Sequence, residues 1–323
     1  MAKGMILAAG LGTRLGPLTH HLPKPLLPVA NRPVMAYGLQ CLAALGITEV
    51  CANASYLAEQ LLSTFGDGDA QGVHLHWLVE DEPSGTAGGM KRVQRYLGDD
   101  RIVLIAGDAM LDVDLAPLLR AHEAHGSFAT LATIPVSHPS HYGVVVTDDK
   151  SHIIQFQEKP APGTEISRQA NTGIYIFEPE IFDLIPAGEF CDFALHIFPE
   201  ILRLGLPFHA FPVDGYWTDV GNPGEYLRAN MDFLQGGIHV EGTGTRLGGN
   251  LICGDAACPG AQLSNCVIGT GVTLPAGSAL SRCVVWPQTA IPDPLVLEDG
   301  VVTPWGTFEI REGTAHPQES VVA

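Results

Sequence analysis

Short apolar runs alternate with amphipathic stretches from residue 5 to about residue 235. The apolar runs predict strands at 5–9, 48–53, 73–79, 101–106, 128–135, 143–147, 152–157, 172–177 and 208–213. Helix-type spacing of apolar residues predicts helices at 33–45, 56–65, 87–97, 114–125, 178–185, 194–204 and 222–234. This alternation is typical of an α/β domain, so we expect a Rossmann-like, mostly parallel sheet with helices on both faces. Ligands of such sheets bind beyond the C-terminal strand ends, which here are the loops after residues 9, 79 and 106.

Helical spacing stops after about residue 238, where glycine, proline and small residues become frequent. The stretch LSNCVIGTGVTLPAGSA (263–279) aligns with LSRCVVWPQTAIPDPLV (280–296) at a shift of 17 residues, and 248–262 is a looser copy. Three strands of about six residues per coil are typical of a β-helix. We therefore expect a catalytic domain at 1–237, a short C-terminal left-handed β-helix at 238–311 and a frayed tail at 312–323. The alternative for the C-terminal part is an irregular β-tail.

The composition suits one large domain with an appendage, or two domains. Of the 323 residues, 46% are hydrophobic and the mean hydropathy is slightly positive, so the chain can bury a full core. The sequence has no run of 18 uncharged apolar residues and no basic segment before the first strand, so we expect a cytoplasmic protein without a membrane span. The seven cysteines are scattered without a CxxC pair, which favours reduced, buried thiols.

The net charge of −18 argues against nucleic acid or an anionic membrane as a partner. A phosphate ligand would be repelled by most of such a chain. The few cations must then lie at the site itself, and we expect a divalent metal ion to assist them.

The apolar run 5–9 leads directly into Gly10-Leu11-Gly12-Thr13-Arg14. Closely spaced glycines after a strand let the backbone approach a phosphate, whose oxygens the exposed N–H groups can bind. Arg14 adds a planar fork of donors, and Lys24, between two prolines, adds a compact charge on a restricted backbone. The spacing fits neither a Walker A loop nor a GxGxxG dinucleotide loop. The alternative is an ordinary exposed loop that carries two cations.

The stretch GLGTRLGPLTHHLPKPLLPVANRPVMAY (10–37) resembles the signature of the sugar-1-phosphate nucleotidylyltransferases, the NDP-sugar pyrophosphorylases. The resemblance extends to about residue 235 and is nearest to the mannose-1-phosphate guanylyltransferases, many relatives of which carry a C-terminal β-helix. It implies that Arg14 and Lys24 are catalytic residues. It also implies a nucleotide site made by Leu7, Ala8, Ala9, Gly10, Gly12, Thr13, Glu80, Pro83, Gly85 and Thr86.

The stretch EDEPSGTAGG (80–89) follows the apolar run 73–79 and resembles the family's base-binding loop. The resemblance implies that Gly85 lets the base lie on the backbone and that Glu80 helps to read the base edge. Uridylyl and thymidylyl members usually have glutamine at the position of Glu80. A carboxylate can accept both N–H donors of guanine, so the loop favours GTP. The alternative is that Glu80 is a surface acid near a helix.

Two aspartates resemble the family's metal ligands. Asp108 ends the buried-strand pattern VLIAGD (103–108), and Asp219 lies in the W-x-D-x-G pattern that begins at Trp217. Two carboxylates, phosphate oxygens and water provide the oxygen ligands that Mg²⁺ prefers. For Asp219 the alternative is a helix cap near residue 223. We expect Asp112 and Asp114 to turn the chain and cap the next helix.

Further family-like stretches are YGVV (142–145), EKP (158–160) and NTG (171–173). The resemblance implies that Glu158 binds sugar hydroxyls and that Lys159 binds the sugar phosphate. The full set of implied sugar-phosphate residues is Tyr142, Gly143, Glu158, Lys159, Asn171, Thr172 and Trp217. His20 and His21, between Arg14 and Lys24, are interpreted as solvated loop histidines.

The resemblance implies an enzyme that uses Mg²⁺, an NTP and a sugar 1-phosphate to make an NDP-sugar and pyrophosphate. The first candidate pair is GTP with mannose 1-phosphate, and the second is dTTP or UTP with glucose 1-phosphate. A different class, a non-catalytic nucleotide-sugar sensor, usually loses one of the arginine, lysine or aspartates that are all present here. A β-helix acyltransferase activity lacks a candidate histidine in 263–311. We expect the β-helix to make contacts in a homo-oligomer instead.

Overall fold

The computed structural model describes residues 2–310 and 318–319, and the chain forms two units. The first unit contains Met1–Gly10 and Met35–Trp217, and the second contains Leu11–Val34 and Thr218–Ala323. The loop that follows the first strand therefore packs with the C-terminal third of the chain. The predicted domain boundary at 237/238 remains a prediction.

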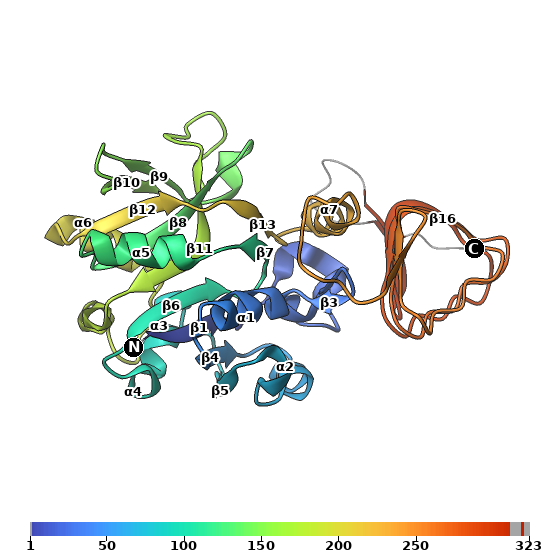
Figure 1. The fold of residues 1–323 in the computed structure, drawn as a ribbon, viewed down its shortest axis with the longest axis horizontal. Helices are drawn as coiled ribbons and strands as arrows, with labels where there is room; N and C mark the ends of the chain where they lie inside the picture. Colours follow the sequence, from blue (N-terminus) through green and yellow to red (C-terminus); the bar gives the residue numbers. More distant parts are fainter. Residues whose placement is uncertain (1, 311–317, 320–323) are drawn as a thin grey trace. The chain divides into compact units, whose positions relative to one another are not determined.

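A nine-stranded sheet forms the centre of the first unit (Figure 1). Four neighbouring strands are parallel, in the order β5 (His74–Val79), β4 (Glu49–Ala54), β1 (Ala2–Leu7) and β6 (Arg101–Ala106). The next strand, β11 (Gln169–Phe177), is antiparallel to β6, β8 (Ala129–Pro135) and β9 (Val144–Thr147). The sheet is completed by β10 (Ile153–Gln157), antiparallel to β9, and by β12 (Phe208–Pro212), parallel to β8. The expectation of a mostly parallel sheet is therefore corrected to a parallel-rich mixed sheet, because short links without a crossover helix join β9, β10 and β11.

Helices cover both faces of the parallel strands, as predicted. A Cβ on Gly38 of α1 (Met35–Ala44) would lie 3.4 Å from the side chain of Ile6, so α1 packs closely on that face of β1. Met5, the preceding residue of β1, points to the opposite face and shares a core cluster with Met90 of α3 (Thr86–Arg92). The other helices of this unit are α2 (Ala58–Phe65), α4 (Gln94–Leu97), α5 (Ala116–Ala124) and α6 (Phe198–Leu204).

The structure adds elements that the sequence pattern did not predict. The two strands β7 (Ala109–Val113) and β13 (Gly215–Asp219) form a separate two-stranded sheet. The predicted helix 87–97 is interrupted at Val93, and the predicted helix at 178–185 is a 3-10 segment, Pro179–Leu184. The start of the predicted helix 194–204 is a π-helical turn, Phe193–Ile197. Each interruption is shorter than the window over which helical spacing is measured.

The second unit combines the early loop with α7 (Pro223–Leu234) and the C-terminal strands. The loop contains two 3-10 segments, Thr13–Thr19 and Lys24–Leu26, and then the short hairpin of β2 (Pro28–Val29) and β3 (Arg32–Pro33). The C-terminal strands are β14 (Thr245–Leu247), β15 (Asn250–Ile252), β16 (Gln262–Ser264), β17 (Val267–Ile268), β18 (Ala279–Val285), β19 (Val296–Thr303), β20 (Gly306–Glu309) and β21 (Gln318–Glu319).

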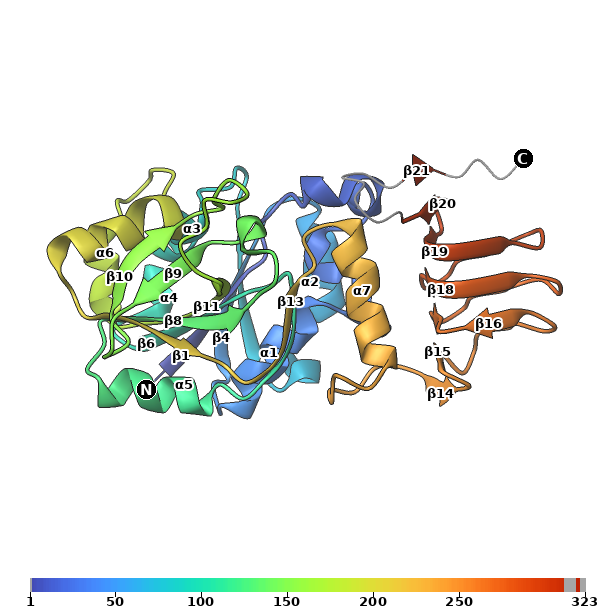
Figure 2. The same ribbon diagram turned by 90° about the horizontal axis from the view of Figure 1, so that it is seen from above.

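Residues 245–303 are here called the coil stack; β14 is antiparallel to β15, and from β15 to β19 the strands pair in parallel at about the predicted interval. Val267 pairs with Val284 and Ala279 with Val296, each 17 residues further along the chain. In the looser first copy Leu251 pairs with Val267, a shift of 16 residues. Figure 2 shows β16, β18 and β19 stacked one above another. The predicted tail at 312–323 lies mostly outside the described residues, although Gln318–Glu319 pair with β20.

The sequence predictions on cysteines and membrane spans can be compared with the described residues. All seven cysteines fall within this part of the chain and are free thiols; five are buried, whereas Cys41 and Cys258 are partly exposed. Among residues 2–310 and 318–319, helices are too short or too polar to cross a bilayer.

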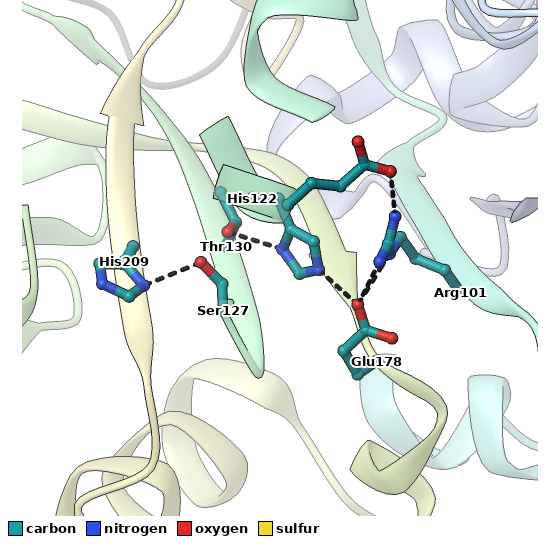
Figure 3. Close-up of polar contacts among 7 residues, drawn as sticks. Arg101, His122, Ser127, Thr130, Glu178 and His209 are labelled. Atoms are coloured by element: carbon teal, nitrogen blue, oxygen red, sulfur yellow. Dashed lines mark hydrogen bonds and ion pairs between the residues drawn. The ribbon is translucent and has the colours of Figure 1, made fainter. Parts of the chain in front are cut away.

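Buried histidines form a polar network in the first unit (Figure 3). The His122 ring contacts Thr130 Oγ1 at 2.8 Å and Glu178 Oε1 at 2.9 Å. His209 Nδ1 lies 2.8 Å from Ser127 Oγ, and its ring centroid lies 4.4 Å from that of His152. Burial, reinforced by the neighbouring histidines, lowers the pKa of His209 to about 4. Burial also lowers the pKa of His122, against the opposing effect of Glu178.

We expect stability to fall as the pH drops from about 6.5 toward about 4. Between these values the unfolded chain binds a proton at His209 that the folded chain excludes, because the folded pKa is the lower one. The loss from this residue is on the order of 2 to 3 kcal/mol when complete. Urea unfolding of wild type and His209→Asn across this pH range measures it, and the variant should show a shallower dependence. His74→Asn, at an exposed histidine, is the control, and equal pH slopes for all three proteins would contradict the assignment.

Candidate active site

The loop of the second unit brings both predicted catalytic cations to one carboxylate. Lys24 Nζ lies 2.8 Å from Asp219 Oδ1, and Arg14 lies 3.7 Å from Asp219 Oδ2. Lys24 is buried, with 6% of its surface exposed, whereas the Arg14 side chain is 57% exposed. The same carboxylate thus contacts one buried and one exposed cation.

Local packing explains the fixed position of Lys24. Pro23 and Pro25 restrict the backbone on either side, and Lys24 begins a 3-10 turn. Gly12 has a φ of 65°, and a Cβ there would lie 3.1 Å from Lys24 Cβ. Thr19 Oγ1 donates to the Gly12 carbonyl at 3.1 Å, which holds the glycine against the lysine stem. The glycine therefore serves the packing of Lys24, in addition to any approach of a phosphate.

Asp219 does not cap the helix that follows it. The N-cap of α7 is Asn222, whose Oδ1 accepts the Glu225 N–H at 3.0 Å. The alternative interpretation of Asp219 as a helix cap is therefore wrong. Its carboxylate remains directed at cations, since both oxygens face Lys24 or Arg14.

In the first unit, a buried polar chain connects three parallel strands at their C-terminal ends. Asn53, the penultimate residue of β4, accepts the Ala8 N–H at Oδ1, 2.8 Å away. Its Nδ2 donates to Glu80 Oε1 at 2.8 Å. The other Glu80 oxygen accepts from the Ser84 backbone and hydroxyl and lies 3.3 Å from Arg92. These hydrogen bonds thus link the start of the glycine loop to the predicted base loop.

Sequence reasoning missed Asn53, and the burial of Glu80 corrects one interpretation. Glu80 is 2% exposed, so the alternative of a surface acid is wrong. Both of its carboxylate oxygens already accept hydrogen bonds within the protein. The Glu80 side chain is also fully buried, so a direct bond to guanine requires this side chain to become accessible. The signal for Asn53 is a polar residue at the end of an apolar strand next to the first one.

The rest of the predicted base loop is anchored to the segment around Cys191. Gly85 has a φ of 84°, and a Cβ there would collide with the Cys191 carbonyl oxygen. Thr86 Oγ1 donates to Asp192 Oδ2 at 2.8 Å and accepts the Phe193 N–H at 2.9 Å. Pro83 precedes this anchored turn and is exposed. The glycine requirement at position 85 thus has a packing cause within the protein.

Asp108 follows the buried strand β6, as predicted. Gly107 N–H donates to the Leu7 carbonyl at 2.9 Å, so the chain turns at the same edge where β1 ends. Burial raises the pKa of the Tyr175 hydroxyl, and the negative charges of Asp192, Glu158 and Asp108 add to this effect. Asp108 therefore contributes to an acidic field shared with a predicted sugar residue. The expectation that Asp112 and Asp114 cap the next helix is wrong, because the N-cap of α5 is Leu115 and has no side-chain cap bond, although Asp114 Oδ1 accepts the Ala116 N–H at 2.9 Å.

The donor chemistry of Asp108 and Asp219 suits a hard cation. Among residues 2–310 and 318–319, no three His, Cys, Asp or Glu side chains are grouped as metal ligands. Mg²⁺ sites in proteins commonly combine one or two carboxylates with phosphate oxygens and water.

The predicted sugar-phosphate residues lie together in the first unit, although they come from separate stretches of the sequence. A Cβ on Gly143 would lie 2.7 Å from Glu158 Oε2, so the glycine makes room for this carboxylate. Lys159 N–H donates to the Tyr142 carbonyl at 3.2 Å, and Lys159 Nζ lies 3.3 Å from Glu158 Oε1. Asn171 N–H donates to the Gly143 carbonyl at 2.8 Å.

A bulge in β11 and an aromatic pair complete this group. The pairing of β11 with β8 shifts register between Asn171 and Tyr175, which is typical of strands near active sites. Asn171 Nδ2 donates to the Tyr175 hydroxyl at 2.9 Å, and Trp217 Nε1 donates to the Thr172 carbonyl at 2.9 Å. The Trp217 ring meets the Tyr142 ring edge-on at 5.4 Å.

The structure thus forms two groups from the predicted residues. Arg14, Lys24 and Asp219 meet in the second unit, which also contains Gly12 and Thr13. The sugar-phosphate residues, the base loop, Asp108 and the strand-end residues Leu7, Ala8, Ala9 and Gly10 belong to the first. A Cβ added at the exposed Gly10 would meet no described atom within 4 Å, so packing does not require a glycine there.

Comparisons with known proteins show the family of this chain. Residues 3–236 match the sequence model of the Nucleotidyl transferase family. The chain is 42% identical over 240 residues to a UTP–glucose-1-phosphate uridylyltransferase of Synechocystis sp., covering 70% of this chain and 62% of the relative. It is 33% identical over 298 residues to a mannose-1-phosphate guanylyltransferase of Mycobacterium tuberculosis, covering 91% and 82%.

A solved structure has the same fold. It belongs to a Bacillus anthracis protein assigned as a glucose-1-phosphate thymidylyltransferase, crystallised with sucrose. The TM-score is 0.65 at 29% identity, over 71% of this chain and 94% of that one. The chain spans less than two thirds of the length of the Synechocystis relative.

We expect the two cations at Asp219 to contribute unequally to stability. Arg14→Met removes an exposed, 3.7 Å ion pair and should cost less than about 1 kcal/mol. Lys24→Met leaves the mostly buried Asp219 without its nearest cation and should cost roughly 2 to 4 kcal/mol. Urea unfolding measures both losses. Adding Asp219→Asn to Lys24→Met should restore part of the second loss, and equal losses for the two single variants would refute the distinction.

Asn53→Leu should weaken both stability and nucleotide binding. The change removes the hydrogen-bond partner of the buried Ala8 N–H and that of Glu80 Oε1, at roughly 1 to 3 kcal/mol each. Because the two loops then lose their link, the KM for the NTP should rise more than the KM for the sugar phosphate. Ser127→Ala, at another buried hydrogen bond, is the control for stability alone. An NTP KM that shifts no more in Asn53→Leu than in this control would show that Asn53 is only structural.

Proposed function

Because the chain belongs to the nucleotidyl transferase family, we propose that it transfers a nucleoside monophosphate from an NTP to a sugar 1-phosphate. The observation that carries this proposal is the assembly of the seven predicted sugar-phosphate residues into one contact group. They are drawn from four separate stretches of sequence, and their contacts are mutual. A chance match to the family's short motifs would not require such convergence.

The proposed reaction is a displacement at phosphorus. A phosphate oxygen of the sugar 1-phosphate attacks the α-phosphorus of the NTP, the bond to the β-phosphate oxygen breaks, and pyrophosphate leaves. No covalent intermediate is needed, so the protein must align two anions and neutralise their charge. Lys24 supplies a charge held in place before binding, while the exposed Arg14 can follow the pyrophosphate.

The acidic residues of the site have complementary roles in the proposal. Glu158 accepts hydrogen bonds from sugar hydroxyls, and Lys159 beside it binds the phosphate of the nucleophile. Asp108 and Asp219 would hold Mg²⁺. When bound, this ion supplies positive charge to the α-phosphate. Before substrates bind, Lys24 and Arg14 balance Asp219, and both cations can exchange to phosphate oxygens.

For the substrates we propose GTP and mannose 1-phosphate. The relative that matches 91% of this chain is a mannose-1-phosphate guanylyltransferase, and the loop at 80–89 resembles that class. UTP with glucose 1-phosphate is the second candidate, favoured by the 42% identity to the Synechocystis uridylyltransferase. The burial of Glu80 keeps the second candidate open, because the group that would select guanine is not exposed to a ligand.

The coil stack is proposed to be a short left-handed β-helix of about three coils. Its support is the parallel pairing at intervals of 16 and 17 residues. We further propose that its outer surface contributes to a homo-oligomer. The free thiols favour a reducing compartment such as the cytoplasm.

The test is pyrophosphate release with Mg²⁺ across five nucleotides and several sugar 1-phosphates. We expect the largest kcat/KM with GTP and mannose 1-phosphate, and none of this activity in Asp108→Asn at an unchanged melting temperature. A largest value with UTP or dTTP and glucose 1-phosphate would keep the reaction and reject the substrate assignment. Nucleotide binding without turnover of any pair would reject the enzyme in favour of a sensor.

A further inference from the structure

A strained hairpin follows the Lys24 turn directly. β2 and β3 are joined by Ala30 and Asn31, whose φ values are 50° and 61°. Two-residue hairpins need this left-handed conformation, but alanine adopts it only at a cost that surrounding contacts must offset. Val34 N–H donates to the Leu27 carbonyl at 3.0 Å, which fixes the hairpin to the end of the Lys24 turn.

The tip of this hairpin is held by the C-terminal part of the same unit. Ala30 N–H donates to Asn230 Oδ1 of α7 at 2.9 Å, and the Ala30 carbonyl accepts the Thr243 N–H at 2.9 Å. Asn31 Nδ2 donates to the carbonyls of Thr243 and Ile268, each at 3.0 Å. Since Ile268 lies in β17, the coil stack contacts the hairpin tip directly.

The base of the hairpin is held by a second, fully buried connection. Tyr226 Oη of α7 donates to the Pro28 carbonyl at 2.7 Å. The same hydroxyl accepts the indole N–H of Trp286 at 2.8 Å, and Trp286 follows strand β18 of the coil stack. A third contact lies in the loop before the hairpin. The His21 ring stacks on the Trp305 ring, and the ring centroids are 4.8 Å apart.

Helix α7 connects these contacts to the catalytic ion pair. Tyr226 and Asn230 are four residues apart on one face of the helix, and Asn230 Nδ2 donates to the Tyr226 carbonyl at 3.0 Å. Asp219, the partner of Lys24, precedes the same helix. Helix α7 is therefore bonded to the coil stack through Tyr226 and to the hairpin after Lys24 through Tyr226 and Asn230.

We propose that the coil stack is a positioning element for the catalytic loop, with Asn31, Tyr226 and Trp286 as its positioning residues. The contacts are made by directional donors to particular carbonyls, which fix a backbone position more narrowly than apolar packing does. Small displacements of reacting groups reduce turnover steeply, by roughly 100-fold for a shift of 1 Å. This inference rests on the proposed role of Lys24.

Two variants remove the bonds with little change of shape. Tyr226→Phe keeps the ring and loses both hydrogen bonds, and Asn31→Gly loses the amide while it tolerates the positive φ. Val272→Ala, in the coil-stack core, is the control for lost stability. Steady-state kinetics give kcat and both KM values at a temperature where all proteins are folded. Hydrogen–deuterium exchange of residues 11–27 gives a readout that does not need activity.

We expect kcat to fall about 10-fold or more in Tyr226→Phe and Asn31→Gly, with both KM values within about two-fold of wild type. Exchange in 11–27 should be faster in these two variants and unchanged in Val272→Ala. Wild-type kcat in both variants, or the same fall in the control, would overturn the proposal. If wild type turns over no substrate pair, the proposed function fails, and unchanged exchange in 11–27 would then refute the positioning role separately.

Discussion

The ion pair between Lys24 and Asp219 constrains the site more than any other single contact. It joins residues 195 positions apart in sequence at 2.8 Å, with the lysine almost fully buried. A buried ammonium needs a partner, so the loop and the segment before α7 must adopt their places together. The glycine at position 12, the two prolines and the hairpin at 28–33 all serve to hold one end of this pair.

Much of the first unit could be predicted from the sequence, because its strands and helices are long enough for their periodicities to differ. The strands β1, β4, β5 and β6 follow from the sequence within a few residues, as does α1. The antiparallel direction of β11 could not be predicted, because hydrophobic alternation contains no information on strand direction. The strands β7 and β13 were missed because their pairing is set by a contact between distant segments.

The candidate site shows the same division. Motifs singled out the predicted sugar-phosphate residues, which contact one another in the structure, and both ends of the Lys24–Asp219 pair. They could not identify Asn53. From sequence alone, an asparagine near the end of a strand cannot be recognised as a buried link, because asparagine is equally common in turns. Nor could they show that Gly85 and Gly143 make room for protein atoms, namely the Cys191 carbonyl and the Glu158 carboxylate. A glycine in a motif thus indicates that some atom comes close to its backbone, but it does not show whether that atom belongs to a ligand or to the protein.

The second unit is discontinuous, and this affects how the protein is made. Its first segment, Leu11–Val34, leaves the ribosome long before Thr218 and the residues that follow. At about 5 to 20 residues per second, the 195 residues between Lys24 and Asp219 take roughly 10 to 40 s to synthesise. Every segment of the first unit has been synthesised before Asp219, so its sheet can form before residues 11–34 contact the C-terminal part of the second unit. Lys24 can acquire Asp219 as its partner only after about two thirds of the chain has been made.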